Sequence, residues 1–219
     1  MLPIWTPGIL VMSYILGSIP FGLLLVKLGT GKDIRQVESG RTGGTNAMRA
    51  AGFWTGLATA LLDILKSASA VWLARTLLPG HAWLDVLAPV MAVIGHNYSL
   101  FLIERTENGR LRFRGGAGGA PTAGGAMGLW LPSILIIIPV GAAILFGIGY
   151  ASVATMSIAI VATLIFAFRA WLAGGPWIYV VYGLLAEILL ILALRPNIRR
   201  LLAGNERIVG WRAKRHKEN

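Results

Sequence analysis

The residues best suited to chemistry lie in a glycine-rich loop that also carries arginines. This loop covers residues 33–52 and includes Ser39, Gly40, Arg41, Gly43, Thr45, Asn46 and Arg49. Glycines let backbone N–H groups approach an anion, and guanidinium groups bind phosphate through two parallel hydrogen bonds. An apolar run follows the loop, so a helix N-terminus can face the same anion. Composition alone favours a phosphate site and a flexible basic linker about equally.

A second glycine-rich loop covers residues 113–125 and reads FRGGAGGAPTAGG. It offers a second cradle for an anion, formed by Arg114, Gly115, Gly116 and Gly118. The loop lacks the GxxxxGK[ST] spacing of a nucleotide-binding P-loop, so no nucleotide is expected. A third polar segment, residues 195–206, places Asn197 and Glu206 among arginines that also fit as anchors for lipid headgroups.

Ionisable residues fall inside the apolar runs, among them Asp63, Lys66 and His96. Charged or titratable groups are costly inside a membrane and are candidates for function. Asp63 and Lys66 are three residues apart, which places them on one helical face, and we interpret them first as a structural ion pair. His96 lies only a few residues before the arginines of the second loop, so it is a candidate site residue.

Composition identifies a membrane protein. Hydrophobic residues make up 56% of the 219 residues and charged residues 13%, whereas soluble domains carry about 25% charged residues. The chain has no cysteine, which excludes disulfides, thiolate metal sites and a thiol nucleophile. The net charge of +11 comes from Lys and Arg dispersed between apolar runs, so nucleic acid is not an expected partner. The N-terminus has no positive n-region and is expected to begin the first span, without a removed signal peptide.

The apolar runs predict the spans, and the basic clusters predict their direction. Apolar runs occur at residues 8–28, 53–78, 84–103, 122–168 and 177–194. The basic clusters that follow the first, third and last of these runs are all expected to be cytoplasmic. An outside N-terminus and a cytoplasmic C-terminus need an odd number of crossings. Breaking the long run at Pro132 and near Gly149 gives seven; two helices there, with a last span that does not cross, is the alternative.

The predicted fold is therefore an all-α polytopic integral membrane protein with a compact bundle of about seven transmembrane helices. We expect one domain, residues 1–219, which ends in a basic cytoplasmic tail at about residues 208–219. Glycines inside the apolar runs, such as Gly17, Gly124 and Gly147, are expected to let helices approach closely.

The three polar segments together resemble the motif regions of the bacterial acyl-phosphate:glycerol-3-phosphate acyltransferases. Residues 17–52 resemble the first motif region, residues 95–101 with 113–122 the second, and residues 197–206 the third. The sequence DILK at residues 63–66 also resembles the family pattern. The order and spacing match over nearly the whole chain. The family is described as a seven-helix inner-membrane enzyme with cytoplasmic motif loops, which agrees with the count from charge.

The resemblance implies transfer of a fatty acyl group from acyl phosphate to the 1-hydroxyl of sn-glycerol 3-phosphate. The products are lysophosphatidic acid and phosphate, and the reaction is the first acylation of phospholipid biosynthesis. No metal or other cofactor is implied. Acyl phosphate is already activated, so an enzyme can act by positioning it and by neutralising the leaving phosphate.

Site residues follow by position from this resemblance. Ser39 and Arg49 are expected to hydrogen-bond and clamp substrate phosphate, and His96 joins them as a candidate general base. The candidate substrate-binding residues are Gly40, Arg41, Gly43, Thr45, Asn46, Arg114, Gly115, Gly116, Gly118, Asn197 and Glu206. Glu206 is expected to hold the third segment against the arginines.

Two departures from the family pattern affect charged or titratable positions. The family has a lysine where this chain has Ala117, and a histidine where it has Leu194. Arg41, which replaces an asparagine, or Arg114 is a candidate to restore the missing positive charge. His96 or a substrate phosphate oxygen is the candidate to accept the proton.

Two other functions fit parts of the sequence. A catalytically weakened paralogue would bind phospholipid precursors without turning them over, and the two missing motif residues favour it. A small transporter of an organic phosphate would show inverted repeats with broken helices, and we find no convincing internal repeat. The expected partners are the two substrates and membrane lipids, and the oligomeric state is left open, with a monomer among the options.

Overall fold

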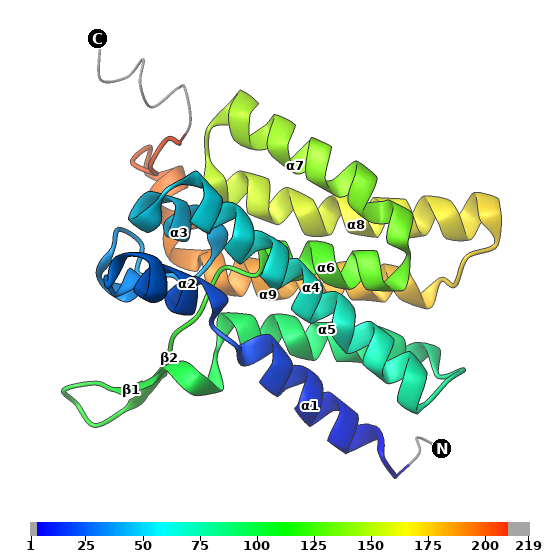
Figure 1. Ribbon diagram of the computed structural model, residues 1–219. Helices are drawn as coiled ribbons and strands as arrows, with labels where there is room; N and C mark the ends of the chain where they lie inside the picture. The colour runs from blue at the N-terminus through cyan, green and yellow to red at the C-terminus, as the bar shows by residue number, and fades with distance from the viewer. Residues whose placement is uncertain (1–3, 210–219) are drawn as a thin grey trace.

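The structure is a computed structural model that describes residues 4–209. It consists of α-helices joined by short loops and one small hairpin (Figure 1). The α-helices are α1 (Thr6–Ser18), α2 (Phe21–Thr30), α3 (Gly44–Ala51), α4 (Phe53–Leu77), α5 (Ala82–Asn97), α6 (Gly119–Leu129), α7 (Ile134–Ile148), α8 (Ala151–Ala173) and α9 (Ile178–Leu202). Short 3-10 helices cover Ile34–Gln36, Leu100–Leu102 and Leu131–Ser133, and the strands are β1 (Ile103–Arg105) and β2 (Leu111–Phe113).

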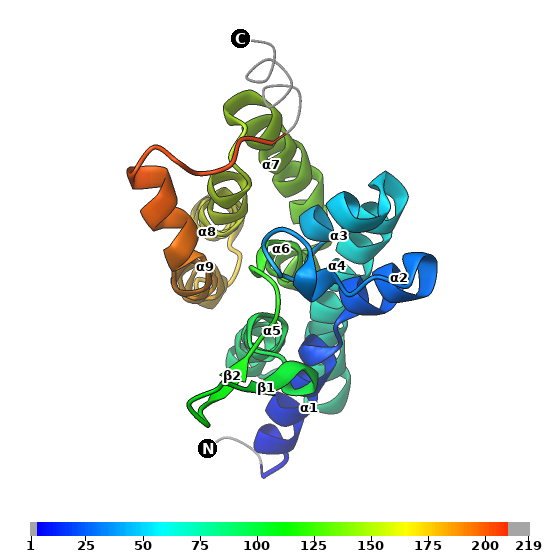
Figure 2. The same ribbon diagram turned by 90° about the vertical axis from the view of Figure 1, so that its left-hand side faces the viewer.

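The long helices run back and forth between two ends of the bundle. In Figure 1, α1, α5, α7 and α9 run one way, and α4, α6 and α8 run the other way. The loops before α3, α6 and α8 and the end of α9 therefore gather at one end, which faces the viewer in Figure 2. We refer to it as the loop end. Of the segments described, six are long and apolar enough to cross a membrane: Thr6–Thr30, Phe53–Leu77, Ala82–Leu102, Leu131–Ile148, Ala151–Ala173 and Ile178–Leu202.

The predicted breaks in the long apolar run are confirmed. The chain leaves α6 at Trp130, passes through a 3-10 turn that contains Pro132, and ends α7 at Gly149, which has a φ of +88°. Of the seven helices expected to cross, α6 is the one that is missing from these six segments, and it has only 11 residues. That is shorter than the roughly 20 residues a helix needs to cross the hydrocarbon layer. Nearly all of α6 is buried among the other helices, so it never has to span lipid by itself.

The first span differs from the prediction of one continuous helix. The helix stops at Ser18 and restarts at Phe21, because Ile19 takes an extended ψ of 117° before Pro20. Proline also lacks the N–H that would continue the helix. Figures 1 and 2 show α2 turned away from the direction of α1 and packed against α3 and α4 at the loop end.

Glycines inside the helices let some neighbouring helices approach closely. A β-carbon on Gly124 would overlap the backbone of Ile64 in α4, and one on Gly17 would overlap the backbone of Ala92 in α5. The prediction that these glycines are contact residues is confirmed. It is wrong for Gly147, which has open space around it, because α7 lies at the edge of the bundle.

The far end of α6 is capped by an arginine. Helices end with carbonyl groups that lack intrahelical partners, and α6 ends inside the protein. The Arg75 guanidinium donates to the carbonyls of Gly128 (2.9 Å) and Leu129 (3.1 Å). Asp85 accepts from Arg75 Nε at 3.1 Å, and the hydroxyl of Tyr179 lies 2.8 Å from Arg75 Nη2. This network fixes the depth of α6, and so the position of its N-terminus.

Candidate functional site

A cavity of about 490 Å³ opens at the loop end between α3, α4, α6, α7 and α8. Its interior is apolar, with Ile137, Ile138, Gly141, Ala142 and Ile158 of α7 and α8 on one side. Its mouth is polar and draws on all three segments singled out in the sequence. The polar residues at the mouth and in the wall are Glu38, Ser39, Arg41, Thr45, Asn46, Arg49, Asp63, His96, Ser152, Thr155, Asn197, Arg200, Asn205, Glu206 and Arg207.

The first loop is shaped by a buried asparagine. The Asn46 side-chain amide donates to the backbone oxygens of Ile34 (3.2 Å), Val37 (2.9 Å) and Arg41 (2.9 Å). These bonds curl the loop over the start of α3, for which Gly43 is the N-cap residue. Asn46 therefore stabilises the shape of the first loop through its backbone carbonyls. Ser39 Oγ accepts a hydrogen bond from the backbone N–H of Arg41 at 3.4 Å.

The second loop packs directly on the first loop and on α5. The backbone N–H of Thr42 donates to the Gly115 oxygen at 3.2 Å, and that of Gly116 donates to the His96 oxygen at 2.9 Å. A β-carbon on Gly115 would overlap the backbone oxygens of His96 and Asn97. Only glycine therefore fits where the loop crosses the end of α5.

Gly118 turns the second loop into α6. It has a φ of +93°, in the left-handed region that favours glycine, and it is the N-cap residue of α6. The N-termini of α3, α6 and α8 all border the cavity, through Gly43, Gly119 and Ala151. Free N–H groups at helix N-termini attract anions, so three such ends surround the mouth.

Glu206 organises the third segment. Its carboxylate accepts from Asn197 Nδ2 at 2.7 Å and pairs with Arg200 Nε at 3.3 Å. Arg207 pairs with Glu38 of the first loop, and Ile208 bridges to Tyr150 before α8. The third segment is thereby tied to the first loop and to the α7–α8 turn. Of the basic tail expected at about residues 208–219, only its first two residues are among those described.

The arginines at the mouth are only partly neutralised. Arg200 and Arg207 each pair with a glutamate, whereas Arg41 and Arg49 have no acidic partner within the described residues. Arg41 Nη2 donates to the Ala193 oxygen at 2.7 Å. Burial lowers the pKa of Arg41, and the like charge of Arg200 lowers that pKa further. Burial also lowers the pKa of Arg49, against the attraction of Glu206. Both guanidinium groups would be stabilised by a bound anion.

A buried polar triad lies where α4 and α5 border the cavity. Lys66 Nζ lies 2.7 Å from Asp63 Oδ1 and 3.0 Å from His96 Nδ1, and it donates to the Ile19 oxygen at 2.9 Å. Asp63 and His96 also line the cavity. The ion pair between Asp63 and Lys66 is confirmed, and His96 extends it to the site.

Most of the predicted site residues meet around this cavity. Those that line it are Ser39, Arg41, Gly43, Thr45, Asn46, Arg49, His96, Gly118, Asn197 and Glu206. Gly115 and Gly116 pack behind the cradle, and Gly40 lies in the turn of the first loop with a φ of +66°. Of the two arginines considered as a replacement for the missing lysine, Arg41 is at the mouth, where its guanidinium donates to the oxygen of Ala193, the residue before Leu194.

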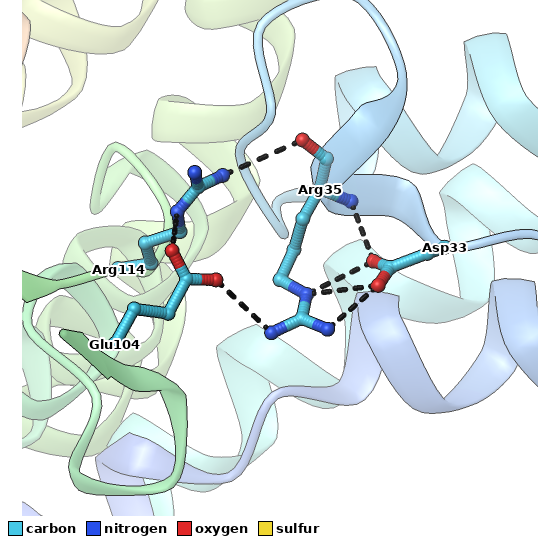
Figure 3. A network of polar contacts seen from close by, with 4 residues as sticks. All are labelled: Asp33, Arg35, Glu104 and Arg114. Atoms are coloured by element: carbon cyan, nitrogen blue, oxygen red, sulfur yellow. Dashed lines mark hydrogen bonds and ion pairs between the residues drawn. The ribbon is translucent and has the colours of Figure 1, made fainter. Parts of the chain in front are cut away.

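Arg114 lies outside the cavity, in an ion-pair network shown in Figure 3. Glu104 of β1 pairs with Arg114 Nε at 2.6 Å and with Arg35 Nη1 at 3.1 Å, and Arg35 pairs with Asp33 at 2.6 Å. The hydrogen bond from Arg35 holds the pKa of Asp33 below its usual range. Arg114, whose Nη1 also donates to the Arg35 oxygen at 3.5 Å, thus clamps the β1–β2 hairpin to the first loop and does not line the cavity.

Two groups of site residues were not singled out from the sequence. Arg200 and Arg207 were interpreted mainly as anchors for lipid headgroups and were not among the candidate site residues. Ser152 is buried and lines the cavity, and its Oγ has no hydrogen-bond partner in the described structure. The only signal for Ser152 was its place one residue into the helix that begins after Gly149 and Tyr150.

The helices define a polytopic integral membrane protein, and its apolar cavity has a cationic mouth. The sequence profile of the family described as "Glycerol-3-phosphate acyltransferase" matches residues 8–204. The chain belongs to this family of acyltransferases, and the resemblance seen in its motifs is confirmed.

Individual relatives match over nearly the whole chain. Glycerol-3-phosphate acyltransferase 2 of Moorella thermoacetica is 36% identical, covering 93% of this chain and 97% of that protein. Glycerol-3-phosphate acyltransferase 3 of Dehalococcoides mccartyi is 34% identical, with 94% and 96% covered. The fold is similar to the crystal structure of PlsY (YgiH), an integral membrane glycerol 3-phosphate acyltransferase, in its glycerol 3-phosphate form. That comparison has a TM-score of 0.79 and 31% identity, and covers 94% of this chain and 96% of that one. The lysophosphatidic acid form of PlsY gives a TM-score of 0.78 at 29% identity, with 94% and 95% covered.

Proposed function

We propose that this chain transfers a fatty acyl group from acyl phosphate to the 1-hydroxyl of sn-glycerol 3-phosphate. It would release lysophosphatidic acid and phosphate at the cytoplasmic face of the bacterial inner membrane. The observation that carries this proposal is one cavity with unpaired arginines at its mouth and an apolar interior among the helices. The related PlsY forms are named for glycerol 3-phosphate and for lysophosphatidic acid, which supports the acceptor and the product.

The geometry fits ligands that join a phosphate to an acyl chain. The mouth presents Arg41 and Arg49, Ser39, and three helix N-termini, all of which favour an anion. The apolar wall, with Ile137 and Ile158, suits an acyl chain that extends from the same molecule into the bundle. If the phosphate of acyl phosphate lies at the mouth and its acyl chain lies in the interior, the carbonyl carbon of the ligand lies near the polar residues of the mouth.

The reaction does not require the protein to form a covalent intermediate. The hydroxyl oxygen of glycerol 3-phosphate attacks the acyl carbonyl carbon, an ester C–O bond forms, and the C–O bond to phosphate breaks. The hydroxyl proton leaves with the released phosphate, so charge and atoms balance. Arg41 and Arg49 would act by holding the two phosphates close together and by stabilising the negative charge of the leaving group.

Phosphate release from palmitoyl phosphate tests the proposal. Protein purified in detergent should release phosphate in a manner that depends on glycerol 3-phosphate, and lysophosphatidic acid should accumulate in equal amount. Arg49→Gln should lower kcat/KM by roughly 10- to 100-fold, because hydrogen bonds to charged groups contribute about 1.5–3 kcal/mol. Release no faster than a protein-free blank, while a standard family member turns over, would reject the proposal.

Ala117 and Leu194 favour a second candidate, a weakened relative that binds these ligands without turnover. Both residues line the cavity, so the cation and the titratable ring that the resemblance leads one to expect are missing from its wall. Saturable binding of glycerol 3-phosphate, without release of phosphate in the same preparation, would decide for this second function.

A further inference from the structure

Lys66 uses all of its hydrogen-bonding capacity inside the protein. Its ammonium group has three N–H donors and no acceptor. Three acceptors surround it: Asp63 Oδ1 at 2.7 Å, the Ile19 oxygen at 2.9 Å and His96 Nδ1 at 3.0 Å. The side chains of Lys66, Asp63 and His96 are 2%, 1% and 4% exposed, so water is largely excluded. Each donor of Lys66 therefore meets one protein acceptor.

This arrangement fixes the histidine tautomer. A donor-only ammonium group can contact Nδ1 only if that nitrogen carries no proton, so the ring proton is on Nε2. Asp63 is the other group near Nδ1, but at 3.4 Å it is farther away than Lys66. A neutral Lys66 would leave a protonated His96, at the longer distance of 3.4 Å, as the counter-ion of Asp63, whereas a charged Lys66 pairs with Asp63 at 2.7 Å and leaves the ring neutral.

The opposite edge of the ring faces the substrate-binding loops. A β-carbon on Gly116 would overlap His96 Nε2, so this nitrogen lies against the second glycine-rich loop. Within residues 4–209, no hydrogen bond to Nε2 is found, and His96 lines the cavity. The ring is thus held through Nδ1, and Nε2 has no protein hydrogen-bond partner among the described residues.

We propose that Lys66 locks His96 as the Nε2–H tautomer, which makes His96 a hydrogen-bond donor to a phosphate oxygen in the cavity. Lys66 is then a positioning residue for this contact. The identity of the ligand rests on the proposed acyl transfer, whereas the tautomer does not. The inference replaces the general-base role expected for His96. A protonated Nε2 has no free lone pair with which to accept a proton, and the lone pair of Nδ1 is taken up by Lys66.

Nitrogen-15 solid-state NMR on the full chain in lipid bilayers tests the tautomer. The chain has three histidines, at positions 81, 96 and 216, and the spectrum of His96→Gln identifies the signals of His96. We expect a non-protonated Nδ1 and a protonated Nε2 in the wild type. A proton on Nδ1, or on both nitrogens, at neutral pH would overturn the proposal.

Removing the lysine tests its role. In Lys66→Met, the ring should lose its fixed tautomer and place a proton on Nδ1, facing Asp63, while the loop-end variant Lys27→Met should leave the His96 signals unchanged. An unchanged His96 spectrum in Lys66→Met would contradict the positioning role. Because the wild-type spectrum decides the tautomer alone, the test does not depend on the folding of the Lys66 variant.

The turnover of His96 variants distinguishes a hydrogen-bond donor from a general base at this position. Glutamine carries an amide N–H close to the position of Nε2, so His96→Gln should keep kcat within about tenfold of the wild type, whereas His96→Leu should lose roughly 10- to 100-fold. Equal and near-complete loss in both variants would show a base and contradict the donor role. If the wild type itself releases no phosphate, the proposed function fails, while the NMR result still decides the tautomer.

Discussion

Single residues at the site are constrained by how closely the two glycine-rich loops pack on α5. Gly116 is the sharpest case, because a β-carbon there would overlap His96 Nε2. We expect Gly116→Ala to lower kcat at least about tenfold, since the ring or the loop must shift from its position in a packed site. The control is Gly29→Ala, because Gly29 has open space around it. Wild-type turnover in Gly116→Ala would show that the loop does not pack on the ring.

Of the two arginines considered as a replacement for the missing lysine, Arg41 is the one that lines the cavity. Arg41→Gln should reduce phosphate release by roughly 10- to 100-fold, because the first loop would lose an unpaired charge beside the phosphate. Arg105→Gln is the matched control, since Arg105 is exposed on β1 and makes no ion pair within the described chain. Equal effects of the two changes on the rate would mean that Arg41 acts only through general surface charge.

The residue types at the mouth were predictable from sequence, but their partners were not. Arg41 and Arg114 are both arginines in glycine-rich loops, and nothing in their local sequence separates them. Glu104 separates them in the structure, because the hairpin brings its carboxylate onto Arg114 and leaves Arg41 unpaired. Such pairing depends on contacts between loops that are distant in the chain.

Among the elements, α6 depends on a partner at its far end. Arg75→Met should lower the free energy of unfolding by about 1–3 kcal/mol, because two helix carbonyls and Asp85 would lose their donor. Thermal unfolding in detergent measures this change. The control is Arg110→Met, at an exposed position next to β2. A Tm of Arg75→Met equal to that of the control would show that α6 needs no cap.

The clamp between the hairpin and the first loop should depend on pH. The pKa of Asp33 is lowered in the folded state, so its contribution is present above the ordinary pKa of the carboxyl and is lost as pH falls through the lowered value. We expect Asp33→Asn to reduce stability at pH 7 by about 1 kcal/mol or less, and the difference to shrink once the pH falls below the ordinary pKa of the carboxyl and to vanish below the lowered pKa. Glu107→Gln, at the exposed hairpin tip, is the control for charge alone. A difference between Asp33→Asn and the wild type that does not change with pH would contradict the clamp.

At the scale of the whole molecule, apolarity and charge predicted most of the architecture. The boundaries of α4 and the breaks at Pro132 and Gly149 follow from run length, proline and glycine, which act locally. The break between α1 and α2 was missed although Pro20 marks it, because the apolar run continues through it. α6 was expected to be a short span near the lower length limit, but at 11 residues it is shorter than that limit. The sequence does not show this, because a helix that is buried on all sides carries the same apolar pattern as one that spans lipid.

The central claim is that three separate polar segments meet at one face of the membrane around one phosphate site. The chain has no cysteine, so single cysteines at Gln36, Asn108, Asn205 and Pro79 can be labelled without background. A membrane-impermeant maleimide should label the first three from the cytoplasmic face in inverted vesicles, and Pro79 only from the opposite face in intact cells. Labelling of Gln36 and Asn205 from opposite faces would contradict the claim.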